Sequence, residues 1–183
     1  LAAAETAHGA PAQPAESSEI VFGAQEGVQP LETAETVVAE VLANASSLQQ
    51  LVGDMPVEPE LSADLMCLAQ AVYFEARGEP IEGQLAVAEV IINRAESGLY
   101  PSDYCGVVTQ PAQFSFVKRG RIPHVNEGSA AWQRAKAVAM VADQDLWESE
   151  AADALYFHAN YVKPSWAQRK VQLAKIDTHI FYR

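Results

Sequence analysis

Apolar residues recur at helical spacing in the stretch that begins at residue 61. The stripe steps by four, three and four residues, and its members are Leu61, Leu65, Leu68 and Val72. This period predicts an amphipathic helix over about 62–76, with Ser62 as its N-cap and Gly78 as its stop. The next position on the same stripe is Glu75, so the pattern places a carboxylate on a face that should be buried.

Two further helices are predicted by the same criterion. One covers about 80–96, begins near Pro80 and is apolar around most of its circumference. The other covers about 129–143 and is capped by Ser129. The intervening residues 100–128 are rich in Pro and Gly, so they are predicted to be largely loop.

Short runs of β-branched and aromatic residues predict four brief strands. These runs are 107–109, 114–116, 154–158 and 179–182. Three dominant helices with few, short strands are typical of the α+β class. The expected fold is therefore a mostly helical domain with a small antiparallel β-sheet.

The N-terminal third of the chain has a different composition. Residues 1–30 are rich in small and polar residues and are predicted to be largely disordered. A weaker apolar stripe indicates a possible helix at 32–52, and two prolines then interrupt the segment 53–60. The expected organisation is an acidic, low-complexity tail over 1–60 and a folded domain over 61–183.

Charge follows the same division. The chain has 24 acidic and 12 basic residues, and residues 1–60 hold ten of the acids and no Lys or Arg. The remaining domain has 14 acids and 12 bases and is nearly neutral. Neither part has the basic excess of a nucleic-acid-binding protein.

No stretch approaches the ~18 consecutive apolar residues of a membrane span. The acidic tail is a possible docking segment for a protein partner.

The two cysteines, Cys67 and Cys105, both fall in the folded part. In an exported protein an even count favours a disulfide, whereas in a cytosolic protein both would be buried free thiols. The start at Leu1 without Met fits either a processed export signal or an artificial boundary.

Glu75 is the first candidate for chemistry. A carboxyl on a buried helical face loses hydration, which raises its pKa and keeps it protonated longer, as a general acid near neutral pH requires. The alternative is a structural glutamate paired with Arg77 or Arg94.

Residues 67–183 resemble the SleB-type cell wall hydrolases. The matching segments occur in collinear order and include Cys67-Leu68-Ala69, Tyr73-Phe74-Glu75-Ala76-Arg77-Gly78-Glu79-Pro80, Gly83-Gln84-Leu85-Ala86-Val87-Ala88, Asn93-Arg94, Tyr100-Pro101, Cys105-Gly106-Val107-Val108, Gln113-Phe114-Ser115-Phe116, Tyr156-Phe157-His158, Trp166-Ala167 and His179-Ile180-Phe181-Tyr182-Arg183. No segment before residue 61 takes part in the resemblance.

The resemblance implies a lysozyme-like domain that cleaves the glycan strands of peptidoglycan between N-acetylmuramic acid and N-acetylglucosamine. It implies a lytic transglycosylase with Glu75 as its one catalytic carboxylate, no cofactor, and export to the periplasm or cell envelope. Muramidase-type hydrolysis by the same Glu75 is the alternative chemistry.

Six residues are candidates for contact with the sugar. Gln113 is expected to hold an N-acetyl group, Ser115 to hydrogen-bond the sugar, and Phe114 to lie in the same segment, although alternation equally allows a core role for it. Flat faces for sugar rings are offered by Tyr73, Tyr156 and Trp166, although burial is the commoner fate of aromatic residues.

Two other classes of function remain open. A zinc-dependent amidase acting on peptide stems would need clustered ligands, but His124, His158 and His179 have no paired spacing, so no metal ligand is assigned. The other is a non-catalytic wall-binding module with a structural Glu75. The neighbouring acids Glu79 and Glu82 are interpreted as structural residues at the start of the helix over 80–96, and Glu89 as a solvated or helix-pairing residue.

Overall fold

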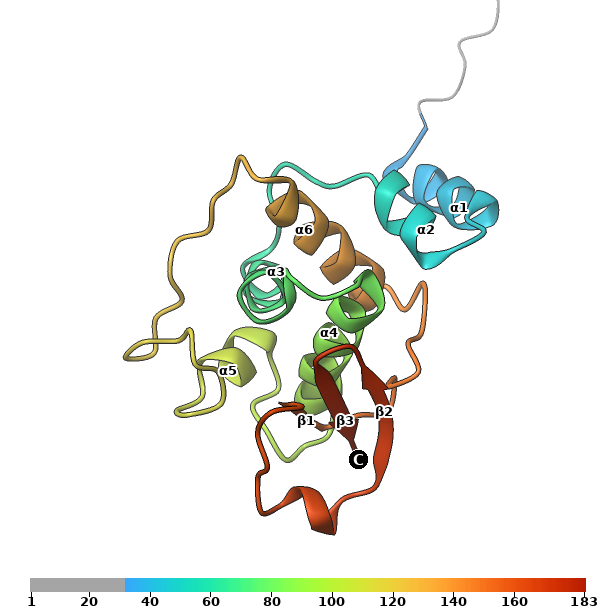
Figure 1. The fold of residues 1–183 in the computed structure, drawn as a ribbon. Coiled ribbons are helices and arrows are strands. Elements are labelled where there is room, and N and C mark those ends of the chain that lie inside the picture. The colour runs from blue at the N-terminus through green and yellow to red at the C-terminus, as the bar shows by residue number, and fades with distance from the viewer. Residues whose placement is uncertain (1–31) are drawn as a thin grey trace, which may run out of the picture. The chain divides into compact units, whose positions relative to one another are not determined.

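The computed structural model describes residues 32–183, so the disorder predicted for residues 1–30 lies outside the described part. The helices are α1 (Ala34–Asn44), α2 (Leu48–Asp54), α3 (Ala63–Ala76), α4 (Ile81–Glu96), α5 (Tyr104–Thr109) and α6 (Ala130–Asp143), with a 3-10 turn at Ala167–Arg169. The strands are β1 (Tyr156–Ala159), β2 (Gln172–Ile176) and β3 (His179–Tyr182). The predicted α+β class, mostly helical with a small antiparallel sheet, is confirmed (Figure 1).

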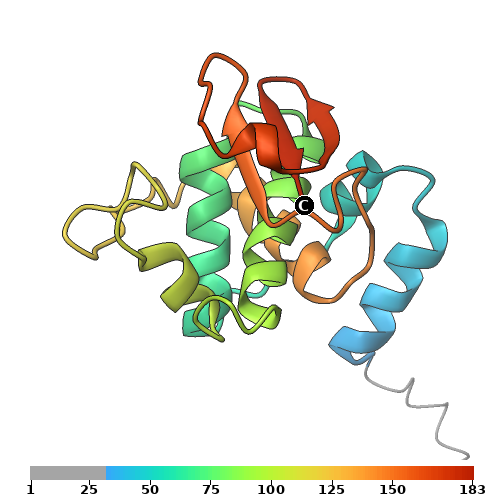
Figure 2. The same ribbon diagram turned by 90° about the horizontal axis from the view of Figure 1, so that it is seen from below.

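The three long predicted helices are α3, α4 and α6. The Ser62 hydroxyl accepts a hydrogen bond from the Leu65 amide at 3.2 Å, and the Ser129 hydroxyl accepts one from the Trp132 amide at 3.1 Å, so both predicted caps are confirmed. α4 lies at the centre, beside α3 in Figure 2, and is buried along most of its length because α3, α5 and α6 all pack against it. No helix in residues 32–183 combines the length and the apolar character needed to cross a bilayer.

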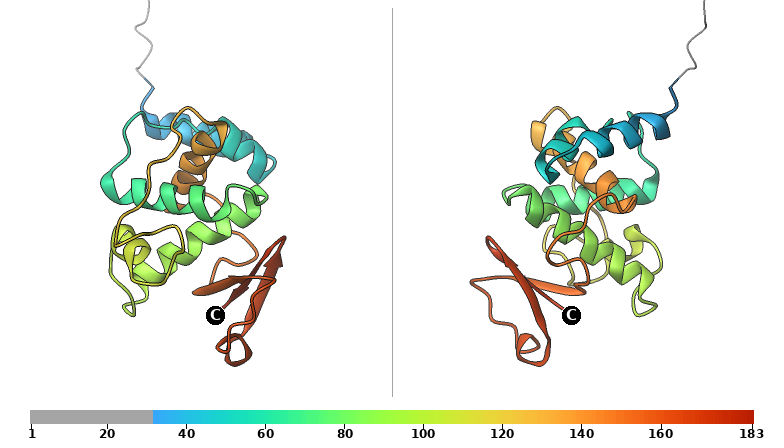
Figure 3. Two further views of the ribbon diagram at one scale, coloured as in Figure 1. Left: turned by 60° about the vertical axis from the view of Figure 1, so that its left-hand side comes forward. Right: turned by 90° about the vertical axis from the view of Figure 1, so that its right-hand side faces the viewer.

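The three strands form one antiparallel sheet in the order β1-β3-β2. Phe157 pairs with Phe181 across β1 and β3, and Ile176 pairs with His179 across β2 and β3. The sheet lies at the end of the helical body away from α1 and α2 (Figure 3). β1 and β3 fall on predicted runs, but β2 was not predicted.

The run 107–109 is helical, so the predicted strand there is wrong. It forms the end of α5, whose N-cap Asp103 accepts a hydrogen bond from the Gly106 amide at 2.7 Å. The Thr109 hydroxyl donates to the Cys105 carbonyl one turn earlier, at 2.7 Å. The cap and the burial of the two valines against neighbouring helices outweigh their β-propensity.

The run 114–116 is also not a strand. A turn bond from the Val117 amide to the Phe114 carbonyl, at 3.2 Å, replaces ladder pairing. Phe114 is buried, and its ring centroid lies 5.5 Å from that of Phe116 and 6.4 Å from that of Phe157. The aromatic side chains therefore serve the core beneath the sheet rather than an additional strand.

The segment expected to hold one possible helix at 32–52 contains two. They are α1 and α2, and the second is capped by Ser47, whose hydroxyl accepts from the Gln50 amide at 3.2 Å. α2 buries Leu51 in the same core as α4 and α6. The compact unit consequently extends from Glu32 to Arg183, and the boundary expected at residue 60 lies within it.

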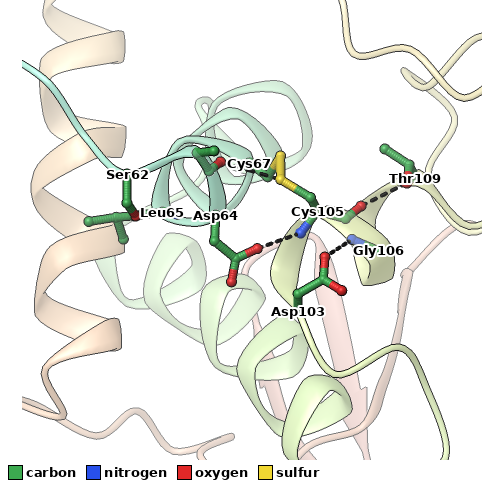
Figure 4. Close-up of a disulfide and its surroundings, with 9 residues drawn as sticks. Ser62, Asp64, Leu65, Cys67, Asp103, Cys105, Gly106 and Thr109 are labelled. Atoms are coloured by element: carbon green, nitrogen blue, oxygen red, sulfur yellow. Dashed lines mark hydrogen bonds between the residues drawn. A yellow bond between two sulfur atoms is a disulfide. The ribbon is translucent and has the colours of Figure 1, made fainter.

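Cys67 and Cys105 form a disulfide that joins α3 to α5 (Figure 4). The Cys105 amide also donates to the Asp64 carboxylate at 2.9 Å, so α5 is fastened to α3 by two adjacent links. The helix that carries Glu75 is thereby anchored at its other end.

Candidate active site

Glu75 opens onto a cavity of about 450 Å³ between the C-terminal end of α3, the loop after α5 and strand β1. The lining residues come from segments far apart in sequence and are Glu75, Arg94, Tyr100, Ala112, Gln113, Tyr156, Phe157, His158, Ala159 and Trp166. Glu75 is the only carboxylate among these lining residues. The structure thus brings four sequence-predicted site residues together: Glu75, Gln113, Tyr156 and Trp166.

Glu75 is the second-to-last residue of α3 and is half-buried. Burial removes water from its carboxyl group and raises its pKa above the ordinary value. Within residues 32–183, no hydrogen-bond donor or cation lies within bonding distance of the carboxylate. The side chain therefore keeps both oxygens available for a ligand in the cavity.

The two arginines considered as partners for Glu75 have other contacts. The Arg77 guanidinium lies 4.8 Å from the centroid of the Tyr73 ring. Arg94 is buried, and its Nε donates to the Leu155 carbonyl at 2.8 Å while its Nη1 donates to Gln113 Oε1 at 3.2 Å. Neither forms an ion pair with Glu75 in the described structure, which removes the main support for a purely structural glutamate.

Asn93 and Arg94 tie the end of α4 to the segment that leads into β1. The Asn93 Nδ2 donates to the carbonyls of Ala152 and Ala154 at 2.6 and 2.9 Å, and Arg94 continues the series at Leu155. These bonds fix the strand that supplies one wall of the cavity. Asn93 is thus a positioning residue for β1 and neither caps α4 nor enters the cavity.

The nearby acids Glu79 and Glu82 are bound elsewhere in the structure. The Glu79 carboxylate accepts hydrogen bonds from the Thr178 hydroxyl and, at 3.2 Å, from the Thr178 amide, so it joins the start of α4 to the turn between β2 and β3. The Glu82 carboxylate accepts from the Glu150 amide at 3.2 Å. Both contacts match the structural roles expected for these residues.

Glu89 differs from its prediction as a solvated or helix-pairing residue. It is 8% exposed and accepts hydrogen bonds from the Ser149 amide, at 2.9 Å, and from the Ser149 hydroxyl. Burial is the main reason that its pKa rises to about 7, with smaller contributions from the charges of Glu82 and Glu148. It lines a different cavity, on the side of α4 near Asp143.

Aromatic side chains and a histidine line the same cavity as Glu75. The ring centroids of Tyr156 and Trp166 lie 5.6 Å apart, and the Lys170 ammonium lies 3.9 Å from the centroid of the Tyr156 ring. His158 Nδ1 donates to the Ala159 carbonyl at 2.8 Å, which leaves Nε2 of the neutral ring to accept from the Tyr182 hydroxyl at 2.9 Å. The ring is thereby fixed in one tautomer.

Three predicted contact residues do not line the cavity. Phe114 is a core residue, and Ser115 beside it is exposed to solvent. Tyr73 is 6% exposed and packs edge-on against Trp132, with ring centroids 5.9 Å apart. For Phe114 and Tyr73 the core alternative weighed from the sequence matches their burial.

The sequence did not single out Arg94, Tyr100 and His158 as lining residues. Each occurs in a segment of the family resemblance, and that was the available signal. Their place in the cavity depends on contacts between segments about 60 residues apart in the chain, such as the hydrogen bond from Arg94 to the Leu155 carbonyl.

The histidines are not assembled with other donors. No group of three or more His, Cys, Asp or Glu side chains in residues 32–183 is close enough to hold a metal ion. Both nitrogens of His158 are engaged, while Nδ1 of the buried His179 has no hydrogen-bond partner in that part of the chain. Burial lowers the pKa of His179, so its 3.8 Å approach to Glu79 is not that of a charged pair.

A desolvated, unpaired carboxyl in the same cavity as aromatic side chains is an arrangement suited to acid catalysis on a carbohydrate. The chain belongs to the cell wall hydrolase family, whose model matches residues 78–182. The match begins three residues after Glu75, so the role of Glu75 depends on the geometry described above.

Curated relatives include the spore cortex-lytic enzyme of Bacillus subtilis (strain 168), which is 36% identical over 118 residues. That alignment covers 64% of this chain and 37% of the relative. The spore cortex-lytic enzyme of Oceanobacillus iheyensis is 36% identical over 121 residues, covering 64% of this chain and 41% of the relative. The chain thus spans well under half the length of these relatives.

Among solved structures, the fold is similar to the catalytic domain of the germination-specific lytic transglycosylase SleB from Bacillus anthracis. The identity is 33% and the TM-score 0.55, with 69% of this chain and 100% of that chain covered. The catalytic domain of the Bacillus cereus SleB protein gives the same identity and TM-score over 95% of its length.

Proposed function

We propose that this protein is a peptidoglycan lytic transglycosylase that cleaves the bond between N-acetylmuramic acid and N-acetylglucosamine. The observation that carries the proposal is Glu75: the one carboxylate lining the cavity, desolvated, and free of any cation or donor in the described structure. Membership of the cell wall hydrolase family and the similarity to the SleB catalytic domains support the same substrate.

In the proposed reaction Glu75 acts first as an acid and then as a base. Protonated Glu75 gives its proton to the glycosidic oxygen as the bond between that oxygen and the muramic C1 breaks. The muramic 6-hydroxyl oxygen then bonds to C1, and its proton passes to the Glu75 carboxylate. The products are a 1,6-anhydromuramic end and a free hydroxyl, and Glu75 returns to its starting state without consumption of water.

A single carboxylate is sufficient because the nucleophile belongs to the substrate. A conventional glycosidase needs a second carboxyl about 5–9.5 Å from the first. The nearby acids Glu79 and Glu82 are held by Thr178 and Glu150 instead. A tethered hydroxyl has a high effective molarity, which replaces the missing residue.

The other lining residues have roles that follow from their contacts. Arg94 donates to Gln113 Oε1, which leaves the Nε2 hydrogens of Gln113 to donate to an N-acetyl carbonyl. Tyr156 and Trp166 offer ring faces to a sugar. Ser115, which is exposed next to this segment, remains a candidate for contact with a longer glycan.

We infer that the protein acts on this substrate in the cell envelope, which it reaches by export, and more specifically in the periplasm. The disulfide between Cys67 and Cys105 supports an oxidising compartment. The acidic composition of residues 1–60 predicts a protein partner for this segment, and this partner remains a prediction.

Mass spectrometry of purified peptidoglycan digested by the wild type and by Glu75→Gln tests the proposal. Anhydromuropeptides from the wild type and their absence with Glu75→Gln are expected. Reducing muramic ends from the wild type would assign muramidase-type hydrolysis to the same glutamate. Undiminished cleavage by Glu75→Gln would overturn the role of Glu75.

A further inference from the structure

A cluster of positive charge lies beside the cavity in a protein of net charge −12. Residues 104–126 contain Lys118, Arg119 and Arg121 and no Asp or Glu. All three basic side chains are exposed, and none has an acidic partner within 4.0 Å in residues 32–183. A quarter of the chain's Lys and Arg is thus concentrated in four residues and not neutralised there.

The backbone holds these charges in a tight turn. The amide of Lys118 donates to the carbonyl of Arg121 and the reverse bond is also made, both at 3.0 Å, which gives an isolated antiparallel bridge. Arg119 and Gly120 occupy the two central positions with φ of 53° and 72°, as in a hairpin turn of the I′ kind. The left-handed region is unusual for arginine, and the two backbone bonds hold position 119 in it, so the three cations stay grouped on one turn.

A second cavity, of about 410 Å³, lies between this turn and the segment after α5. Arg119 and Gly120 line one side, and Gln110 and Ala112 line the other. Ala112 also lines the cavity of Glu75, so the two cavities adjoin at this residue. The loop after α5, which contains this turn, is yellow in Figure 2. A group attached to a sugar in the first cavity can therefore extend into the second cavity, which Arg119 of the turn lines.

We propose that the turn formed by Lys118, Arg119 and Arg121 binds the carboxylates of the peptide stem on the muramic acid next to the cleaved bond. This inference rests on the proposed function. The stem is the anionic group covalently attached to that sugar, so charge complementarity and the adjoining cavity select the same ligand. The turn is a specificity-determining element, and Glu75 remains the catalytic group.

The test compares native sacculi with sacculi whose stem carboxylates have been converted to amides with a carbodiimide and ammonia. The turn variant is Lys118→Gln/Arg119→Asn/Arg121→Gln, in which Asn retains the left-handed backbone of position 119. The control variant is Arg134→Gln/Lys163→Gln/Lys175→Gln, which removes the same charge from other exposed positions. Initial rates of anhydromuropeptide release give kcat/KM for each pair.

The wild type and the control variant are expected to cleave native sacculi about tenfold faster than amidated sacculi. This factor is what three exposed charge contacts of ordinary strength contribute together. The turn variant is expected to cleave both at the rate that the wild type shows on amidated sacculi. A wild type that does not distinguish the two substrates would overturn the inference and leave the proposed function intact. If the control variant lost its preference for native sacculi as fully as the turn variant, the inference would also be overturned, since the attraction to the stem carboxylates would then come from the overall charge and not from the turn. Failure of the wild type to cleave either substrate would instead remove the proposed function.

Discussion

Two glutamates on adjacent buried helices have raised pKa values, but their surroundings differ. Glu89 on α4 is the more strongly perturbed, with a pKa of about 7, yet both its oxygens accept hydrogen bonds from Ser149. Glu75 on α3 has no such partner and faces a cavity with aromatic walls. The comparison shows that desolvation alone does not identify an acid catalyst. A free oxygen next to space for a substrate is the second requirement.

The comparison is tested most strongly by replacing each glutamate with glutamine. Glu75→Gln is expected to lower the rate of glycan cleavage about 1000-fold, because the amide cannot donate the required proton. Glu89→Gln is expected to retain wild-type cleavage at pH 6. Rates of muropeptide release measured on matched amounts of folded protein give both values.

Circular dichroism of both variants controls for misfolding in this experiment. A large rate loss in Glu89→Gln with an unchanged melting temperature would contradict the assignment, because it would give the bonded glutamate a role in catalysis.

The helix of Glu75 is cross-linked to α5, whereas the helix of Glu89 is not. Removing the link in Cys67→Ala/Cys105→Ala is expected to lower the free energy of unfolding by about 3–4 kcal/mol, the loop-closure value for a disulfide spanning 38 residues. Chemical denaturation measures this loss. Cleavage well below the melting temperature should persist because Glu75 lies at the opposite end of α3 and the bond from the Cys105 amide to Asp64 still fastens α5 to α3. Loss of cleavage by a fully folded double variant would show that the cross-link positions Glu75.

Glu89 predicts a specific dependence of stability on pH. Its pKa is 4.5 in the unfolded chain and about 7 in the fold, so the folded state binds more protons between these values. Its contribution to stability is complete below pH 4.5 and decreases by about 3 kcal/mol as the pH rises to 7. Glu89→Gln should match the wild type at pH 4 and exceed its stability at pH 8. Chemical denaturation at each pH measures the free energy of unfolding of both proteins. A difference between them that stays constant from pH 4 to pH 8 would contradict the raised pKa.

The smallest expected effect concerns recognition of the sugar. Gln113→Leu is expected to raise KM about fivefold with kcat nearly unchanged, because one hydrogen bond to the N-acetyl carbonyl is lost. Steady-state kinetics on acetylated and N-deacetylated glycan measure it. The variant and the wild type should be equal on the deacetylated substrate, and a retained difference there would assign Gln113 another role.

The sequence predicted the parts of the fold that depend on local periodicity. α3, α4 and α6 have long apolar stripes and local caps such as Ser62, and Glu75 follows from the same stripe. The runs 107–109 and 114–116 were misassigned because their β-propensity is outweighed by the Asp103 cap and by aromatic packing. The wall of the site was not predictable from local pattern, because Arg94 meets its partners only through the tertiary fold.

The burial of α2 has a consequence for producing the protein. Leu51 is fully buried and Val52 nearly so, against the helices of the main core, although both precede the matched segment by more than twenty residues. Recombinant fragments cut at residue 60 or 78 would expose the apolar surface that α2 covers, and such a surface favours aggregation. A soluble, crystallisable fragment should therefore begin no later than Glu32.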